Sequence, residues 1–252
     1  MIEQDVTGGI ATVRLAHGKV NALDLELCRA IEETTRGLDT PDVRAVVLTG
    51  SGRAFSAGVD LTRIVDGGAD YVAAYLPALA GAFQAVFDLG RPVVAAVNGH
   101  AIAGGCVLAA ACDHRIMATG GGTIGVPELH VGVPFPTVAF EIMRYALGPV
   151  GARRAILGGT NQPPAEALAH GLIDELTTPD DLLDRARTVA GGLATAIPAD
   201  TFRHTKTQLH QEANRRIADG DDTATLHLWQ TAASDGRIRA FMDRTVHARR
   251  DA

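Results

Sequence analysis

The sequence predicts an α/β core followed by a region made of helices. Two successive stretches, residues 44–89 and 92–112, have the same order: a short apolar strand, a turn rich in glycine, and a helix. Beyond Pro198 the pattern is helical to the end of the chain. Strands that alternate with helices are typical of an α/β core. We therefore expect a core over residues 1–197 and a C-terminal helical region over residues 198–252.

The individual elements follow from the spacing of apolar side chains. A period of two residues or a short apolar run indicates a strand, and a period of 3.6 residues indicates a helix. Strands are expected at residues 10–15, 44–49, 93–97, 114–117 and 172–176, and a shorter one opens the stretch 53–61. Helices are expected at residues 25–38, 71–89, 136–147, 151–157 and 163–170, and three or four more follow. Asp24 is a suitable N-cap for the first helix, and Pro77 should kink or interrupt the second.

Residues 93–115 contain the most suggestive local pattern of the chain. An apolar strand runs into Asn98-Gly99, and the small residues 103–105 then form a turn that begins a helix. The first N–H groups of a helix have no intrahelical partner, so they can bind a carbonyl oxygen or an anion. This stretch could therefore polarise a substrate without using a side chain.

Composition and charge exclude several classes of protein. The 252 residues carry a net charge of −6 with a sequence pI of about 5.8, so the basic surface that nucleic-acid binding requires is not expected. The apolar segment 92–112 is interrupted by Asn98, His100 and glycines, which argues against a membrane-spanning helix. Three cysteines without a CxxC pair suggest neither disulfides nor a zinc site. With an acidic N-terminus, these features lead us to expect a cytoplasmic protein.

Three segments together resemble the crotonase family, which contains the enoyl-CoA hydratases and isomerases. They are residues 54–61 (AFSAGVDL), residues 98–106 (NGHAIAGGC) and Pro127-Glu128-Leu129, and the resemblance extends from residue 21 to residue 241. It implies a spiral of ββα units in two sheets. It also implies C-terminal helices that build homotrimers, usually paired into hexamers.

The resemblance further implies an oxyanion hole made by two backbone N–H groups. The matching positions in this sequence are Val59 and Gly104. Donors held in place beforehand stabilise the enolate that forms when a proton leaves the carbon next to a thioester carbonyl. One such donor is worth about 3–4 kcal/mol.

Proton transfer is implied for Glu128, which matches one of the two glutamates used by hydratases of the family. The other glutamate is replaced by Val107, which can transfer no proton. One carboxylate suffices to take a proton from C2 and return it to C4, so the sequence resembles the Δ3,Δ2-enoyl-CoA isomerases most closely. Apolar neighbours, for which Val126, Leu129 and Val131 are candidates, would raise the pKa of Glu128 toward neutrality.

Binding of the acyl-CoA is also implied by the resemblance. Coenzyme A belongs to the substrate, and we expect no separate cofactor and no metal. The expected binding residues are Ala22, Leu23, Ala57, Gly58, Asp60, Leu61, Gly105, Phe241 and Arg244. The last two match positions that approach the coenzyme across a subunit boundary, and residues 64–87 would line the acyl pocket.

Alternative interpretations remain for several of these residues. Ser56 lies in an A-x-S-x-G sequence close to a hydrolase nucleophile motif. His100 could take part in hydration, although packing is the simpler explanation for it and for His130, and Cys106 is expected to be a small buried residue. His204 and His210 lack the spacing of metal ligands, and Arg249 and Arg250 are expected at a solvated helix end. At the level of function, an enoyl-CoA hydratase and a non-catalytic acyl-CoA-binding protein are the alternatives to an isomerase.

Overall fold

The computed structural model describes residues 1–248 and confirms the predicted α/β class. A six-stranded sheet has the order β1–β2–β3–β5–β7–β9, and all its pairs are parallel except β1–β2. A smaller parallel sheet has the order β4–β6–β8. The strands of the large sheet are β1 Ile2–Thr7, β2 Ile10–Leu15, β3 Ala45–Gly50, β5 Val93–Val97, β7 His114–Ala118 and β9 Glu175–Thr177. Those of the small sheet are β4 Ala54–Ser56, β6 His100–Ile102 and β8 Ile124–Gly125.

Three consecutive ββα units build the core, as the resemblance implied. In each unit the first strand joins the large sheet and the second joins the small sheet, and a helix follows. The helices of these units are α2 Leu61–Asp88, α3 Gly104–Ala110 and α4 Glu128–Val131. Because β4, β6 and β8 are parallel neighbours, the loops that follow them lie at one edge of the small sheet. The predicted oxyanion and proton-transfer residues come from these loops.

The large sheet buries both of its faces, which explains why its central strands are apolar throughout rather than alternating. Val46 and Leu48 of β3 pack into the main core. On the other face Ala45 and Val47 pack against helix α7 (Leu182–Ala196), whose small residues Ala186 and Ala190 are fully buried. The remaining helices of the core are α1 Leu25–Gly37, α5 Thr137–Gly158 and α6 Pro164–Ala169.

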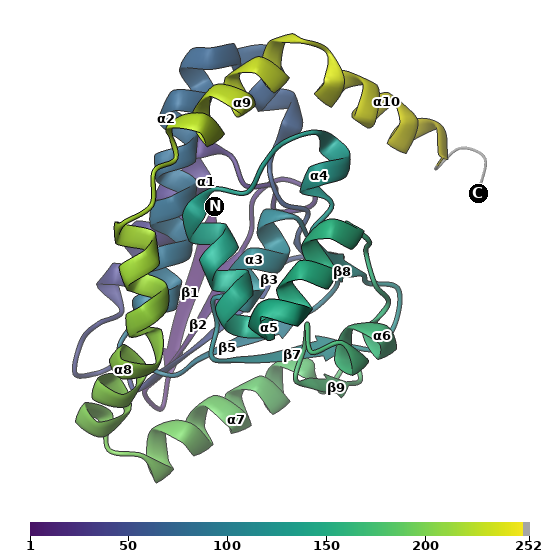
Figure 1. The fold of residues 1–252 in the computed structure, drawn as a ribbon. Helices are drawn as coiled ribbons and strands as arrows, with labels where there is room; N and C mark the ends of the chain where they lie inside the picture. Colours follow the sequence, from purple (N-terminus) through teal and green to yellow (C-terminus); the bar gives the residue numbers. More distant parts are fainter. Residues whose placement is uncertain (249–252) are drawn as a thin grey trace.

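The C-terminal helices pack onto the same core. They are α8 Ala199–Ala218, α9 Thr223–Ser234 and α10 Arg237–Ala248, and the predicted boundary near Pro198 is the turn between α7 and α8. Helix α9 lies alongside α2, and its Trp229 is buried. In Figure 1, α10 passes α4 and extends away from the body of the molecule. No helix in the described part of the chain has the length and apolar character needed to cross a membrane.

Several details of the predicted elements were wrong, and strands β6 and β8 of the small sheet were not predicted. Helix α2 begins at Leu61 and is interrupted at Gly68, whose φ of 59° suits glycine, whereas Pro77 lies inside the helix without a break. Strand β1 was not predicted because five of its six residues are exposed and leave no alternation to read. Strand β9 begins at Glu175, so the buried Leu172 and Ile173 belong to the preceding turn.

Candidate active site

The backbone of Val59 is held in an extended conformation by Leu23. Leu23 N–H donates to the Gly58 carbonyl at 2.7 Å, and Asp60 N–H donates to the Leu23 carbonyl at 3.1 Å. Successive N–H groups of an extended segment point to opposite sides. The N–H of Val59 therefore points away from Leu23 and is available as a donor.

The second predicted donor, Gly104, is the first residue of α3. Ala103 precedes it as the N-cap, and its side chain provides no cap hydrogen bond. Cys106 N–H and Val107 N–H both donate to the Ala103 carbonyl, which leaves the first amides of the helix unpaired within it. Ala103 itself has φ 53° and ψ −124°, a conformation that costs a non-glycine residue on the order of 1–3 kcal/mol. Such strain is concentrated at functional sites.

The two donor segments lie against each other. A Cβ placed on Gly58, which has φ +81°, would lie 2.3 Å from the Ile102 carbonyl oxygen and 3.1 Å from the Gly104 nitrogen. Only glycine allows this approach. A Cβ on Gly105 would lie 2.3 Å from the Ser56 carbonyl oxygen, so the same requirement holds where α3 meets β4. The structure thus brings the predicted Val59 and Gly104 donors to one place.

Glu128 begins the short helix α4 and is buried, with an exposed fraction of 7%. Its Oε2 is buried and has no hydrogen-bond partner among the residues that the structure describes. Burial raises the pKa of Glu128 from 4.5 to about 8 because an apolar environment disfavours the charged form. Val126 and Val131 are buried as expected, whereas Leu129 is 42% exposed, so its predicted place in the apolar surroundings was wrong.

The β6–β8 pairing brings Glu128 to the first turn of α3. Ala103 N–H, one residue before Gly104, donates to the Gly125 carbonyl at 2.7 Å, and Glu128 follows three residues later. Burial raises the pKa of the Cys106 thiol, and the negative charge of Glu128 adds to this shift. A buried carboxylate and two adjacent backbone donors therefore share one region. Val107, in the same turn, is 1% exposed and aliphatic.

Asn21 is a positioning residue that the sequence interpretation missed. It is fully buried with φ 50°, and its side-chain amide donates to the Ala54 carbonyl at 3.0 Å. Ser56 Oγ donates to the Asn21 carbonyl at 2.7 Å and accepts from Gly58 N–H at 3.1 Å. Both Ser56 partners are backbone groups, so its hydroxyl supports the Val59 loop, which favours a structural role over the nucleophile interpretation. An asparagine within a turn was the available signal, because asparagine tolerates positive φ.

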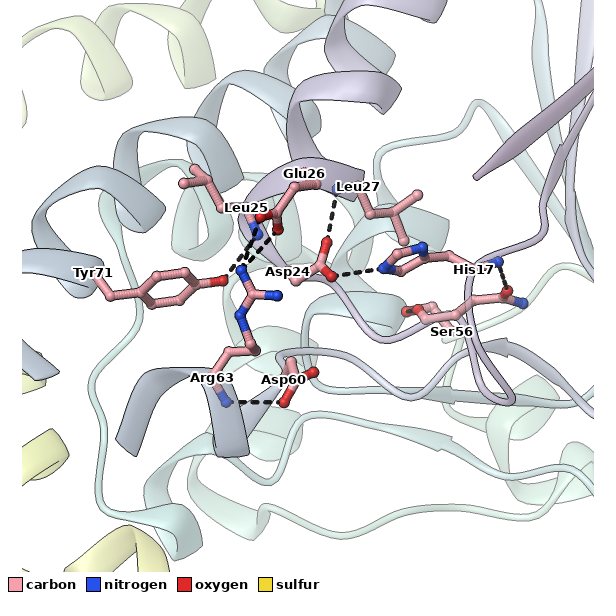
Figure 2. A network of polar contacts seen from close by, with 10 residues as sticks. His17, Asp24, Leu25, Glu26, Leu27, Ser56, Asp60, Arg63 and Tyr71 are labelled. Carbon is pink, nitrogen blue, oxygen red and sulfur yellow. Dashed lines mark hydrogen bonds and ion pairs between the residues drawn. The ribbon is translucent and has the colours of Figure 1, made fainter. Parts of the chain in front are cut away.

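A second polar network joins the start of α1 to the start of α2 (Figure 2). Asp24 accepts from Leu27 N–H at 2.8 Å, which confirms it as the N-cap of α1, and contacts His17 at 2.6 Å. Arg63 pairs with Glu26 at 2.8 Å, and the Tyr71 hydroxyl accepts from Leu25 N–H at 3.0 Å.

This network surrounds the predicted coenzyme-binding segments. Ala22 and Leu23 directly precede the cap residue of α1, while Ala57 lies in the loop before α2. Asp60 caps α2 by accepting from Arg63 N–H at 3.1 Å, and Leu61 is the first residue of that helix. The structure therefore brings these segments together, and their role in binding stays a prediction.

The predicted C-terminal residues lie on α10. Phe241 is partly buried against the core of its own chain, and Arg244 is exposed. Their approach to a coenzyme of another subunit stays a prediction. Arg249 and Arg250 lie outside the described residues.

The two histidines near the motifs have local partners. His100 is exposed and contacts the Thr123 hydroxyl at 3.1 Å. The ring of His130 lies 3.1 Å from where a Cβ would stand on Gly159. Both findings favour packing and hydrogen bonding. Within residues 1–248 no three His, Cys, Asp or Glu side chains are grouped so that they could hold a metal ion.

The fold and the site together define a class of protein: a ββα spiral in which the Val59 loop meets the first turn of α3 and the buried Glu128 follows in the neighbouring loop. The family model described as enoyl-CoA hydratase/isomerase matches residues 5–244. A putative enoyl-CoA hydratase of Thermus thermophilus is 34% identical over 89% of this chain and 90% of its own length. The mitochondrial enoyl-CoA delta isomerase 1 of the rat is 32% identical over 84% of this chain and 74% of its own length.

Solved structures show the same relationship. The human mitochondrial Δ3-Δ2-enoyl-CoA isomerase superposes with a TM-score of 0.88 at 26% identity, covering 100% of this chain and 98% of that one. A probable enoyl-CoA hydratase of Mycobacterium tuberculosis gives a TM-score of 0.80 at 31% identity, and the match covers 88% of this chain and 94% of that one. The chain belongs to the enoyl-CoA hydratase/isomerase family, as the sequence motifs predicted.

Proposed function

We propose that this chain is a Δ3,Δ2-enoyl-CoA isomerase of fatty-acid oxidation in which Glu128 is the only proton-transfer residue. The observation that carries the proposal is the buried Glu128 carboxyl, with its raised pKa and unpartnered Oε2. Its loop pairs, through Gly125, with the residue that precedes the predicted donor Gly104. A base whose pKa lies near the working pH is the kind that proton abstraction requires.

The proposed reaction moves one proton within a 3-enoyl-CoA. The thioester oxygen accepts hydrogen bonds from the N–H groups of Val59 and Gly104. The Glu128 carboxylate takes a proton from C2, and the electron pair of that C–H bond passes into the conjugated enolate. Glu128 then returns the proton to C4, so the double bond moves from C3–C4 to C2–C3. The step is balanced without an oxidant, a metal or a cofactor.

Val107 is the reason for preferring isomerisation to hydration. Addition of water needs one group to activate the water and another to manage the proton at C2. A buried valine can do neither, and His100 is hydrogen-bonded to Thr123. Relatives named as hydratases and relatives named as isomerases both match this chain, so activity has to be measured.

The test is a comparison of two substrates and two variants. Purified protein receives a 3-enoyl-CoA or a 2-enoyl-CoA at several chain lengths, and the products are separated by chromatography. We expect conversion of the 3-enoyl to the 2-enoyl thioester, loss of that conversion in Glu128→Gln, and full activity in Glu166→Gln, which removes an exposed carboxylate from α6.

Two other outcomes point elsewhere. Faster formation of 3-hydroxyacyl-CoA from the 2-enoyl substrate would make the protein a hydratase. Tight acyl-CoA binding without turnover of either substrate would make it a binding protein. We further propose that the chain acts in the cytoplasm as a homotrimer or hexamer. Light scattering after size-exclusion chromatography would test the oligomeric state.

A further inference from the structure

We propose that Trp229 and Asp222 are positioning residues for Glu128, acting through the loop of residues 132–137. The inference rests on the proposed function for its kinetic consequences, whereas the contacts that carry it stand by themselves. They connect the C-terminal helical region to the residues that directly follow α4.

Glu128 is held from its C-terminal side by this loop. The N–H groups of Gly132 and Val133 donate to the Glu128 carbonyl at 3.0 and 3.1 Å. Gly132 has φ +95°, and a Cβ there would lie 2.7 Å from Cδ of Arg237. Any shift of the loop therefore shifts the backbone that carries the carboxyl.

The loop is in turn fastened by side chains from the C-terminal region. Trp229, which is 1% exposed, donates its indole N–H to the Pro134 carbonyl at 2.8 Å. Asp222 accepts from Thr137 N–H at 2.9 Å and from its hydroxyl at 2.8 Å. Helix α5 has no side-chain cap from its own N-cap residue, so Asp222 supplies the negative charge that stabilises a helix N-terminus.

The loop has space to move if these contacts are lost. A groove of about 470 Å³, open to solvent, is lined by residues of α2, by Pro136 and by Asp222. Displacement of the loop would admit water toward Glu128 and reduce the desolvation that raises its pKa. The contacts therefore set both the place of the carboxyl and its proton affinity.

The experiment compares Trp229→Phe, Asp222→Ala and Asp222→Asn with the control Thr231→Val. The last removes a hydrogen bond within α9, from the Thr231 hydroxyl to the His227 carbonyl, and touches nothing in the loop. Hydrogen exchange of a peptide covering residues 128–137 is measured by mass spectrometry, beside the pH dependence of isomerisation. Asp222→Asn keeps one acceptor oxygen and should restore part of what Asp222→Ala loses.

In Trp229→Phe and Asp222→Ala we expect the 128–137 amides to exchange about tenfold faster, with exchange in α1 unchanged. The same variants should show lower kcat at similar KM, and an acidic limb of the pH profile that lies at lower pH.

Unchanged exchange and an unchanged profile, or equal effects in Thr231→Val, would overturn the inference. If Trp229→Phe does not fold, the comparison of Asp222→Ala with Asp222→Asn tests the inference. Absence of isomerase activity in the wild type would refute the proposed function, and the exchange data would still test whether Trp229 and Asp222 hold the loop of residues 132–137.

Discussion

Replacing Glu128 with glutamine should stabilise the folded protein at neutral and alkaline pH. The pKa of the buried carboxyl is about 8, against an ordinary value of 4.5. Between these values the folded state keeps a proton that the unfolded state has lost. The free energy of unfolding of the wild type therefore decreases as pH rises through this window. Glutamine is neutral in the folded and in the unfolded state, so the stability of the variant does not depend on pH at this position.

The size of the effect follows from the difference in pKa. Each unit corresponds to about 1.4 kcal/mol, so ionising Glu128 completely in the folded state costs about 5 kcal/mol. At pH 7 the expected advantage of Glu128→Gln is about 3 kcal/mol, because the folded carboxyl is still mostly protonated there. It should grow by about 1.4 kcal/mol per pH unit below pH 8 and level off above it.

Urea denaturation of both proteins at pH 5.5, 6.5, 7.5 and 8.5, at one protein concentration, measures this difference. Other titrating groups are shared by the two proteins and cancel in the comparison. Glu166→Gln, which removes an exposed carboxylate, serves as the control. If the difference in the free energy of unfolding between wild type and Glu128→Gln stays constant from pH 5.5 to 8.5, the conclusion that burial raises the pKa of Glu128 is refuted.

Three further predictions concern the same site. The kcat/KM of the wild type should rise about tenfold per pH unit up to about pH 8, since only ionised Glu128 takes a proton; a flat profile from pH 6 to 9 would contradict this. Gly58→Ala places a Cβ 2.3 Å from the Ile102 carbonyl oxygen, which should push the two donor segments apart and lower kcat about 100-fold, and an unchanged kcat in steady-state assays would contradict the predicted pair of donors. Ser56→Ala should lower the free energy of unfolding by about 1–3 kcal/mol in urea denaturation, with activity retained; complete loss of activity in the folded variant would instead indicate a catalytic hydroxyl.

The local elements and the class of fold could be predicted from the sequence because both depend on short-range patterns. The apolar run 93–97, the N-cap Asp24 and the glycine turn before α3 are each readable from neighbouring residues. The pairing of strands into two sheets came from the resemblance rather than from those patterns. The exposed strand β1 and the break at Gly68 were not predicted, since neither leaves a pattern in the apolar residues.

The candidate site shows the same division. The resemblance carried by short motifs led to the predicted roles of Val59, Gly104 and Glu128, and the valine at position 107 led to the preference for isomerisation. Only the tertiary structure placed the Val59 loop against Gly104, through the approach of Gly58 to Ile102, and buried the Glu128 carboxyl. Burial depends on segments distant in sequence, and so do the contacts of Trp229 and Asp222 with the loop after α4. The sequence thus determined which groups are present, while the packing of distant segments decided their positions and the proton affinity of Glu128.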